Sequence, residues 1–396
     1  MKILHISYDG MLEPLGQSQV LAYQEKLSKK YQIYLISFEK KHDLANKDAF
    51  FEIKNRMESA GIKWYSLRYH KRFSILSTAF DILRGAFLGL RLIYQNNIEI
   101  IHARSYVAAL IGVGLKKISK KKLIFDMRGF WADERVDGGI WKKKSYLFKI
   151  SKWFEKIFLL QSDHVVSLTR AAIEEINKFP YLKSHSIKFS VIPTCVDMDK
   201  FYNFGNLKKN FILGYVGSIG VWYEFEEVLK AFQVLLKIKP NAELLIVNRN
   251  EHRLILEMIS DLKLSQQSVT LVSVEHKRVP EMMSRMSAGI FFIKPLYSKQ
   301  ASAPTKLGEF LACGIPCLVN HGVGDMTNIV QQNNVGTAIN NFESCTLTEG
   351  IEELIKLVED DSISERCRVV AKTEFSLEQG VIDYSKIYDS LGSSLM

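Results

Sequence analysis

The residues best suited to chemistry gather in one segment of the C-terminal half, KPLYSKQASAPTKLGEF (294–310). It carries three lysines around a Ser-Ala-Pro-Thr turn: Lys294, Lys299 and Lys306. Basic side chains beside a helix start attract anions, because the first backbone N–H groups of a helix have no intrahelical acceptor. The segment therefore predicts a pyrophosphate site that needs no metal ion.

The same segment also predicts where the helix lies. We expect Ser302 to be its N-cap, Pro304 to lie in its first turn and Glu309 to follow about two turns in. Glu309 is then placed to accept hydrogen bonds from a ribose diol, and Gly314 ends the helix before the strand IPCLVN. A strand–helix–strand unit with a purely structural role is the alternative.

A second candidate site follows a predicted strand of the N-terminal half, in FDMRGFWADER (125–135). Charged residues crowd this strand end beside Trp131: Asp126, Arg128, Asp133, Glu134 and Arg135. Ligands bind at the carboxyl ends of strands in open parallel sheets, so the cluster is a candidate site. The alternative is a solvated loop with local ion pairs.

The loop after the first predicted strand, YDGMLEPLGQSQV, is a third candidate. Gly10 and Gly16 bracket a turn, and Gln17 with Ser18 could cap the next helix, whose N-terminus suits a phosphate or a sugar hydroxyl. A plain tight turn is the alternative. The loop lacks the G-x-G-x-x-G pattern, which argues against a dinucleotide-dependent oxidoreductase.

The sequence gives only weak signals for a metal site or a catalytic nucleophile. Asp197-Met198-Asp199 spells a D-x-D, which we interpret as a helix cap rather than a cation site. The five cysteines are scattered and odd in number, and with no secretory signal they indicate reduced thiols in a cytoplasm. The nine histidines form no metal pattern, so no metal or other cofactor is expected.

The elements that must position these residues are short apolar runs separated by longer segments of helical period. Unbroken apolar runs are typical of parallel strands covered on both faces. The predicted strands are residues 2–7, 32–38, 62–67, 98–103, 122–127 and 164–169, then 212–217, 243–248, 269–274, 289–293 and 315–320. This alternation predicts an α/β protein with two doubly wound, Rossmann-like sheets.

The periodicity breaks near residues 193–210, so the chain should divide there. We expect a first domain over 1–195, a second domain over 196–374, and a C-terminal helix in 375–396 that packs back on the first domain. The two domains should face each other across a cleft, with ligands at the strand ends.

Charge is unevenly distributed along the chain. Residues 1–190 hold 33 Lys and Arg against 18 Asp and Glu, whereas residues 191–396 hold 20 against 25. The first half is therefore expected to meet an acidic partner such as anionic lipid or phosphate. Two helix-like segments, 70–95 and 142–160, suit either a membrane surface or a helix that covers a sheet, and Asp81, Arg84 and Arg91 argue against a membrane span.

Several of these segments resemble glycosyltransferase family 4, whose members are retaining enzymes of the two-domain GT-B architecture. SYDGMLEPLGQSQV resembles the family's first glycine loop, and VIPTCVDMDKF its interdomain motif. YVGSIGVWYEFEEVLKAF resembles its first donor-domain strand and helix. SAPTKLGEFLACGIPCLVN resembles its donor motif, and this match is the most specific.

The resemblance implies a set of donor-binding residues: Gly16, Gln17, Gly217, Ser218, Arg249, Lys294, Ser302, Pro304, Thr305, Lys306 and Glu309. It gives catalytic roles to Lys306, as a stabiliser of leaving-group charge, and to Asp126, Arg128 and Glu134, as residues that orient acceptor or sugar. The sequence departs from the family at Ala301, where the first Glu of a Glu-x7-Glu pair usually stands. The family's phosphate-binding Arg and Lys fall on Ser218 and Tyr223, and its usual His falls on Arg128.

The implied activity is transfer of a sugar from a nucleotide-diphosphate sugar to a saccharide or a polyprenyl-diphosphate-linked acceptor, in cell-surface polysaccharide biosynthesis. The basic first half then fits a cytoplasmic protein at the inner face of the plasma membrane, with no nucleic-acid partner. A sugar-nucleotide 2-epimerase is the first alternative, since it shares the architecture and needs no acceptor. A non-catalytic surface-binding protein on a transferase scaffold is the second.

Overall fold

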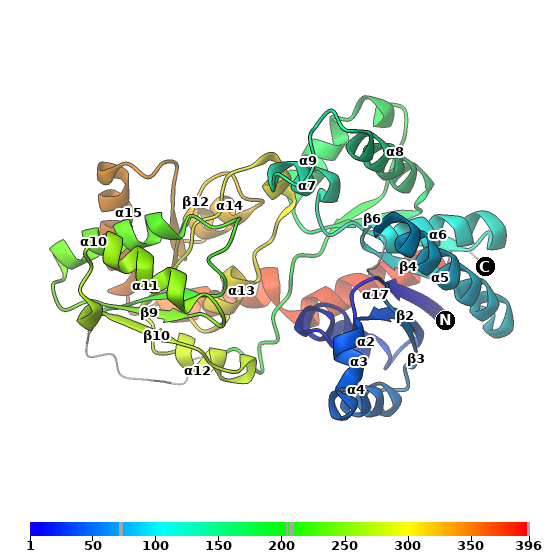
Figure 1. The fold of residues 1–396 in the computed structure, drawn as a ribbon, viewed down its shortest axis with the longest axis horizontal. Helices are drawn as coiled ribbons and strands as arrows, with labels where there is room; N and C mark the ends of the chain where they lie inside the picture. Colours follow the sequence, from blue (N-terminus) through cyan, green and yellow to red (C-terminus); the bar gives the residue numbers. More distant parts are fainter. Residues whose placement is uncertain (71–73, 203–204, 206–209, 394–396) are drawn as a thin grey trace. The chain divides into compact units, whose positions relative to one another are not determined.

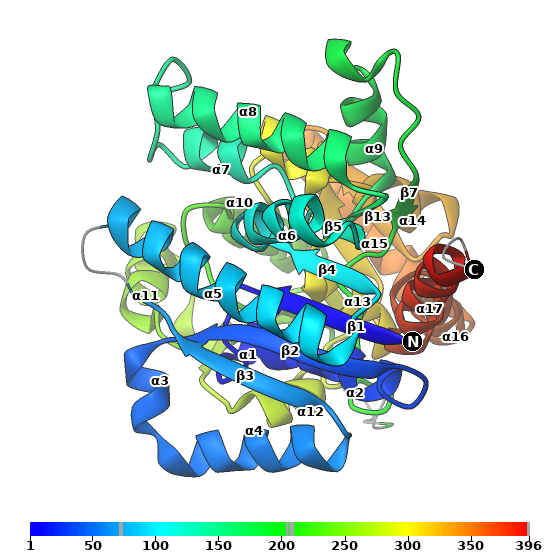
Figure 2. The ribbon, with the colours of Figure 1, turned by 90° about the vertical axis from the view of Figure 1, so that its right-hand side faces the viewer.

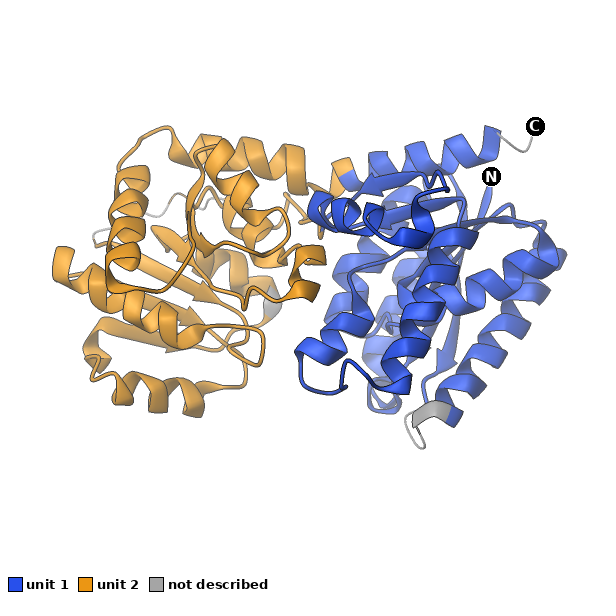
Figure 3. Cartoon of the chain, turned by 90° about the horizontal axis from the view of Figure 1, so that it is seen from above, with its two compact units in different colours: residues 1–193, 380–396 blue, residues 194–379 orange. Residues whose placement is uncertain are grey.

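A computed structural model describes residues 1–70, 74–202, 205 and 210–393 (Figure 1). The chain forms two compact units, residues 1–193 with 380–396 and residues 194–379 (Figure 3). The expected break at 193–210 falls partly on residues 203–204 and 206–209, and the helix-like segment 70–95 includes 71–73; these residues lie outside the described ones.

Unit 1 is built on a sheet of seven parallel strands in the order β3-β2-β1-β4-β5-β6-β7. The strands are β1 (Lys2–Ser7), β2 (Gln32–Glu39), β3 (Lys63–Arg68), β4 (Ile100–Arg104), β5 (Lys122–Asp126), β6 (His164–Ser167) and β7 (Phe189–Val191). The register pairs Ser7 with Arg104 and Arg104 with Asp126. The carboxyl ends of the three central strands therefore meet at one edge of the sheet.

The helices of unit 1 cover both faces of this sheet. They are α1 (Pro14–Gly16), α2 (Ala22–Leu27), α3 (Lys41–Ala45), α4 (Lys47–Ser59), α5 (Ser74–Asn96), α6 (Ser105–Ser119), α7 (Trp131–Asp137), α8 (Tyr146–Gln161), α9 (Arg170–Asn177) and α17 (Leu377–Ser393). Helices α5, α6 and α8 connect β3 to β4, β4 to β5 and β5 to β6, and all three connections step the same way along the strand order. Because such connections are right-handed, the three helices lie on one face of the sheet. Figure 2 shows the three side by side.

Unit 2 repeats the plan with six parallel strands in the order β10-β9-β8-β11-β12-β13. The strands are β8 (Ile212–Val216), β9 (Glu243–Val247), β10 (Val269–Val272), β11 (Ala288–Ile290), β12 (Cys317–Asn320) and β13 (Gly336–Ile339). The helices are α10 (Phe225–Ile238), α11 (His252–Asp261), α12 (Val279–Met283), α13 (Thr305–Ala312), α14 (Met326–Gln332), α15 (Ser344–Val358) and α16 (Ile363–Val370). Its core is a single cluster of buried apolar side chains from both faces of the sheet.

The predicted fold class, two parallel α/β sheets, is confirmed, and each of the eleven predicted strands is present. Two edge strands were missed, β7 and β13. Both are short, and β13 contains Gly336 and Thr337 rather than an unbroken apolar run, so neither stands out by periodicity. The D-x-D interpretation was wrong in detail, because Asp197 caps a turn by accepting from the Asp199 N–H at 3.2 Å.

The C-terminal helix α17 completes the core of unit 1. Its Tyr384 ring packs edge-on against Tyr23 of α2 at 5.7 Å, and Tyr388 packs edge-on against Tyr31 at 5.2 Å. The Tyr31 hydroxyl donates to Asp389 at 2.8 Å. Residues from the far end of the chain thereby reach the central strands of the first sheet. Within the described residues, no helix is long and apolar enough to cross a membrane.

The glycine pair after β1 gives a direct test of the fold. A Cβ on Gly16 would lie 2.0 Å from the Gly10 carbonyl oxygen, so the backbone of the loop would have to move. We expect Gly16→Ala to lower the free energy of unfolding by about 1–3 kcal/mol, measured by denaturant titration of tryptophan fluorescence.

The matched control is Gly114→Ala in α6, where an added Cβ meets no atom within 4 Å. Alanine should stabilise this helix by about 0.5–1 kcal/mol. Equal effects of the two substitutions would contradict the close approach of Gly10 and Gly16.

Candidate functional site

The loop that follows β8 brings the backbone of unit 2 against a lysine. Gly217 has a φ of +107°, and a Cβ on it would lie 3.4 Å from the Lys306 Nζ. Any larger residue would be strained here and would crowd the lysine. The predicted donor residues Gly217 and Lys306 are therefore adjacent.

Lys306 is a buried lysine whose side-chain nitrogen has no hydrogen-bond acceptor. It is 8% exposed, and its Nζ makes no hydrogen bond in the structure. Its Nζ lies over three rings instead, 3.9 Å from the centroid of Tyr223, 4.8 Å from that of Tyr215 and 5.4 Å from that of Phe291. Burial lowers the pKa of Lys306 to about 7, although Glu309 and Glu251 favour its charged form.

Glu309 lies one turn after Lys306 on α13. Burial raises the pKa of its carboxyl group to about 7, and the charge of Lys306 opposes that rise. Near neutral pH both side chains are therefore poised between their charged and neutral forms. A ligand that carries negative charge would favour protonated Lys306.

A carboxylate that the sequence did not reveal holds the loop after β8. Glu251 accepts hydrogen bonds from the Ser218 hydroxyl at 2.9 Å and from the Ile219 N–H at 2.9 Å. Asn248 donates to Glu251 at 2.8 Å and to the Gly217 carbonyl at 3.0 Å. Both residues follow strand β9, and a polar cluster at a strand end is the signal that could have identified them.

The other predicted cations of unit 2 differ in their surroundings. The Lys299 Nζ lies 3.8 Å from the Trp222 ring centroid, and Lys299 is buried. Lys294 is partly buried, and its backbone N–H donates to the Trp222 carbonyl at 3.0 Å. Arg249 is exposed directly after Asn248. Only Lys306 of these cations contacts Gly217 among the residues that the structure describes.

The start of α13 differs from the expectation. The helix begins at Thr305 with Pro304 as its N-cap, and Ser302 instead ends the preceding 3-10 helix. The Pro304 ring cannot donate a hydrogen bond, and its φ of −65° suits the extended N-cap backbone. The Thr194 hydroxyl donates to the Ala303 carbonyl and so fixes this turn. Of the first N–H groups of α13, which a helix leaves without an acceptor one turn earlier, that of Leu307 donates to the Pro304 carbonyl at 3.1 Å.

The second candidate site, in unit 1, is a buried charge cluster around Asp126. Asp126 is 2% exposed and accepts a hydrogen bond from the Tyr384 hydroxyl at 3.0 Å. Arg104 lies 3.5 Å from one carboxylate oxygen and Arg128 lies 3.8 Å from the other. Burial opposes the ionisation of Asp126, but Arg128, His102 and Arg104 outweigh it and hold its pKa well below the usual range.

Arg128 lies in a strained loop that neighbouring helices hold in place. Its φ is +59°, which is unusual for a residue with a side chain, and its guanidinium donates to Gln19 at 3.5 Å. The Tyr106 hydroxyl donates to the Gly129 carbonyl at 3.2 Å and to buried Glu155 at 2.6 Å. Glu134 lies further on, partly exposed in α7.

Sequence reasoning missed several members of this cluster. His102 pairs its Nδ1 with the Tyr388 hydroxyl at 2.7 Å, and its ring lies 4.3 Å from that of His5. Burial lowers the pKa of His5 well below its usual value, and His102 lowers it further. The polar residues at the end of IEIIHAR were a readable signal, whereas the tyrosines of α17 lie too far along the chain to be linked to them.

The loop after β1 uses its N–H groups internally. Buried Glu39 accepts from the Met11 N–H at 2.9 Å and from the Leu12 N–H at 3.1 Å. The helical run begins at Pro14 with Glu13 as N-cap, so the expectation that Gln17 and Ser18 cap it was wrong. Gly16 is buried against Gly10, and the Gln17 amide donates to the Leu12 carbonyl at 3.4 Å.

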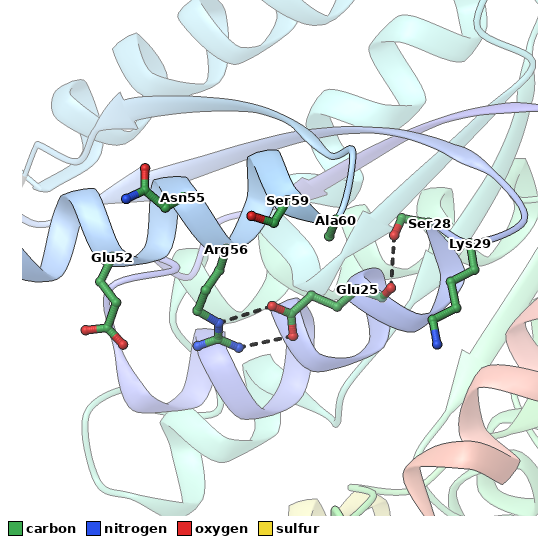
Figure 4. A pocket seen from close by; sticks show the side chains of 8 residues that line it. All are labelled: Glu25, Ser28, Lys29, Glu52, Asn55, Arg56, Ser59 and Ala60. Carbon is green, nitrogen blue, oxygen red and sulfur yellow. Dashed lines mark hydrogen bonds and ion pairs between the residues drawn. The ribbon is translucent and has the colours of Figure 1, made fainter.

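A surface groove lies between α2 and α4 of unit 1 (Figure 4). Its central groups pair with each other, because Arg56 donates to both carboxylate oxygens of Glu25 at 3.1 Å. The Ser28 hydroxyl donates to the Glu25 carbonyl at 2.9 Å. Glu25, Ser28 and Arg56 therefore bond to one another within the groove.

The two clusters differ in what they can do chemically. In unit 2, Lys306, the first N–H groups of α13 and the Gly217 loop form a small cationic site lined by aromatic rings. It can bind an anion such as a phosphate and stabilise charge that develops on it. In unit 1, ionised Asp126 aligns two arginines that can bind hydroxyl or anionic groups.

Comparisons with known proteins agree with this architecture. Solved structures with the same fold include sucrose-phosphate synthase from Thermosynechococcus elongatus, with a TM-score of 0.74, 14% identity and 99% of each chain covered. A glycosyltransferase from Rickettsia africae superposes with a TM-score of 0.72, 17% identity and 98% of each chain covered. Anabaena HepE in complex with UDP-glucose superposes with a TM-score of 0.67 and 14% identity, over 98% of this chain and 100% of that one.

Sequence comparison gives the family. No curated protein matches the chain by sequence. Two family models do match, "Glycosyltransferase Family 4" over residues 20–200 and "Glycosyl transferases group 1" over residues 198–371. The first takes in most of unit 1 and the second most of unit 2. The chain therefore belongs to the family 4, group 1 glycosyltransferases of GT-B type.

Proposed function

We propose that this glycosyltransferase transfers a sugar, with retention of configuration and without a metal ion, from a nucleotide-diphosphate sugar to a saccharide or lipid-linked acceptor. The reaction would serve cell-surface polysaccharide biosynthesis at the cytoplasmic face of the membrane. The observation that carries the proposal is Lys306, a buried lysine without an acceptor beside Gly217 and the start of α13. Among the solved relatives, Anabaena HepE binds UDP and UDP-glucose, which supports a nucleotide-sugar donor.

Unit 2 would bind the donor. The diphosphate would lie at the start of α13, near Ser302, Pro304 and Thr305, with Lys306 against it. Glu309 would accept hydrogen bonds from the ribose diol. Lys294 and Arg249 would meet the remaining phosphate charge from the rim, and Gly217 and Ser218 would allow the loop after β8 to approach closely.

The chemical step follows from this placement. The bond between the anomeric carbon and the diphosphate oxygen breaks, and its electron pair goes to the leaving diphosphate. Lys306 and the N–H groups of α13 stabilise that charge. The acceptor oxygen bonds to the anomeric carbon on the face that the diphosphate leaves, and its proton goes to the leaving phosphate oxygen. This route needs no protein base, which agrees with Arg128 at the family's usual histidine position.

Unit 1 would bind the acceptor. Asp126 holds Arg104 and Arg128 at the carboxyl ends of the central strands, where ligands bind in open sheets. The excess of Lys and Arg in residues 1–190, 33 against 18 acidic residues, favours an acceptor that carries phosphate. Glu134 belongs to the same unit and would orient acceptor or sugar from it.

A sugar-nucleotide 2-epimerase is the nearest alternative, because such enzymes share the architecture. They need carboxylates and a histidine around the sugar, whereas this chain has Ala301 and Arg128 at those places. Incubation with nucleotide sugars alone separates the two functions. Quantitative isomerisation without an acceptor would rule out the transferase.

Removal of the charge on Lys306 should damage transfer strongly. We expect Lys306→Met and Glu309→Gln each to cost about 2–4 kcal/mol of transition-state stabilisation, measured as the ratio of kcat/KM values. Lys237→Met in α10 is the matched control, since Lys237 is exposed and outside the proposed site. Activity of both site variants equal to that of the control would show that the donor site lies elsewhere.

The binding of a nucleoside diphosphate should depend on pH through Lys306. With a pKa of about 7, Lys306 loses its proton as the pH rises, whereas a bound diphosphate favours the protonated form. Affinity should therefore fall from pH 7 to pH 9, by at most about tenfold per pH unit, with proton uptake on binding visible by calorimetry in two buffers.

Lys306→Arg provides the control for that experiment, because arginine stays charged throughout this range. Its affinity for the diphosphate should vary much less with pH between 7 and 9. Identical pH profiles for wild type and Lys306→Arg would assign the proton to another group.

Asp126→Asn should slow sugar transfer and leave the binding of a nucleoside diphosphate nearly unchanged. It removes the charge that aligns Arg104 and Arg128, so we expect about 100-fold slower transfer, or about 2.7 kcal/mol. Affinity for the nucleoside diphosphate should change less than about twofold, because unit 2 holds the proposed donor site. A loss of diphosphate affinity without loss of transfer rate would contradict these assignments.

A further inference from the structure

One surface of unit 1 is apolar where a helix normally faces water. Five large apolar side chains of α5 are between 51% and 75% exposed: Leu76, Phe80, Leu83, Phe87 and Tyr94. At about 100° per residue they lie within about 60° of one another around the helix. They therefore form one continuous stripe rather than scattered exposed residues.

The opposite side of α5 is the one that packs on the protein. Gly85 and Gly89 face Ile111 and Leu115 of α6, where an added Cβ would lie 2.8 Å and 2.7 Å from a methyl group. Asp81 on that side is fully buried and bonded to His70. A helix that is apolar all round is expected to be covered on all sides, yet the stripe on α5 has no cover within the described residues.

A second helix on the same face repeats the pattern. In α8, Tyr146, Ile150 and Trp153 are more than half exposed and also lie within about 60° of one another. Helices α5 and α8 flank α6 on one face of the sheet (Figure 2). Ile118 of α6 is 60% exposed between them.

The charges of this face have one sign. The acidic residues of the three helices are Asp81 and Glu155, and both are fully buried. The basic residues of the helices and of the loop before α8 are Arg84, Arg91, Lys117, Lys142, Lys143, Lys144, Lys149 and Lys156, together with Lys116 and Lys152, which pair with Asp163 and with Asp133 and Glu155. Lys142, Lys143 and Lys144 are all exposed. The outer face therefore combines apolar stripes with positive charge alone.

We propose that the outer face of α5, α6 and α8 docks unit 1 on an anionic lipid bilayer. The stripes on α5 and α8 would enter the boundary between headgroups and acyl chains, where tyrosine and tryptophan rings are favoured. The flanking arginines and lysines would bind headgroup phosphates. This surface deepens the proposed function, since it would bring unit 1 to a membrane that carries a lipid-linked acceptor.

Charge decides between a bilayer and a second copy of the chain. A symmetric dimer through this face would place the same patch of each copy against the other. The basic residues would then face each other without an exposed carboxylate from these helices to offset them. Anionic headgroups supply the missing negative charge, so the bilayer is the favoured occupant.

The test is co-sedimentation of the full chain with phosphatidylcholine vesicles, with and without phosphatidylglycerol. Wild type should bind the anionic vesicles, and high salt should weaken the binding. Leu83→Glu combined with Phe87→Glu should lower the partition coefficient at least about tenfold. The control, Leu256→Glu combined with Val369→Glu, adds the same charge at exposed apolar positions of unit 2 and should bind like wild type.

Two further measurements on the stripe variant distinguish loss of membrane docking from loss of folding. Unchanged melting temperature and unchanged affinity for a nucleoside diphosphate would show that the stripe variant folds and keeps the proposed donor site. Failure of docking is then distinct from failure of the proposed function. Absence of wild-type binding to anionic vesicles, or equal loss in both double variants, would overturn the proposal. So would a wild-type dimer in light scattering that the stripe variant alone dissociates, because the face would then bind a second copy.

Discussion

The site of unit 2 depends on the burial of one cation. Lys306 is held among the rings of Tyr215, Tyr223 and Phe291 with no hydrogen-bond acceptor at its Nζ. A lysine in such a place is costly unless something of opposite charge binds there. The aromatic faces offset part of that cost, and a bound phosphate would offset the rest. The surrounding structure, including Gly217 with its positive φ, keeps the space around that amine narrow.

The charged cluster of unit 1 also lies at the carboxyl ends of parallel strands. There the buried group is a carboxylate, and arginines stabilise its charge. Asp126 is buried and ionised because Arg104 and Arg128 lie beside it and the Tyr384 hydroxyl donates to it. The strained backbone of Arg128 is held by Tyr106, which bonds to Gly129 and Glu155. Such strain persists where neighbouring groups fix the loop, and it is common at functional sites. The C-terminal helix α17 contributes Tyr384 to this cluster and also completes the core of unit 1.

Much of the fold could be predicted from the sequence, because buried parallel strands such as KILHIS and IEIIHA are unbroken apolar runs. Lys306 could be placed beside a helix start because its turn residues precede it directly. The Pro304 cap and the start of the helical run at Pro14 could not be predicted, because helix propensities do not define where a helix begins. Tyr384 and Tyr388 were missed because their roles come from contacts that only the folded chain creates. Glu251 and Asn248 were missed although they follow a predicted strand, where a polar cluster indicates a site.

We propose above that unit 2 binds a nucleotide-diphosphate sugar through Lys306. A thermal-shift screen over nucleoside diphosphates and their sugars tests it most directly, because a ligand that binds only the folded state raises the melting temperature. At a hundred times the dissociation constant the stabilisation is about 2.7 kcal/mol. We expect such a shift for at least one nucleotide sugar in the wild-type protein and none in Lys306→Met. No shift with any nucleotide sugar, or an equal shift in the variant, would contradict it.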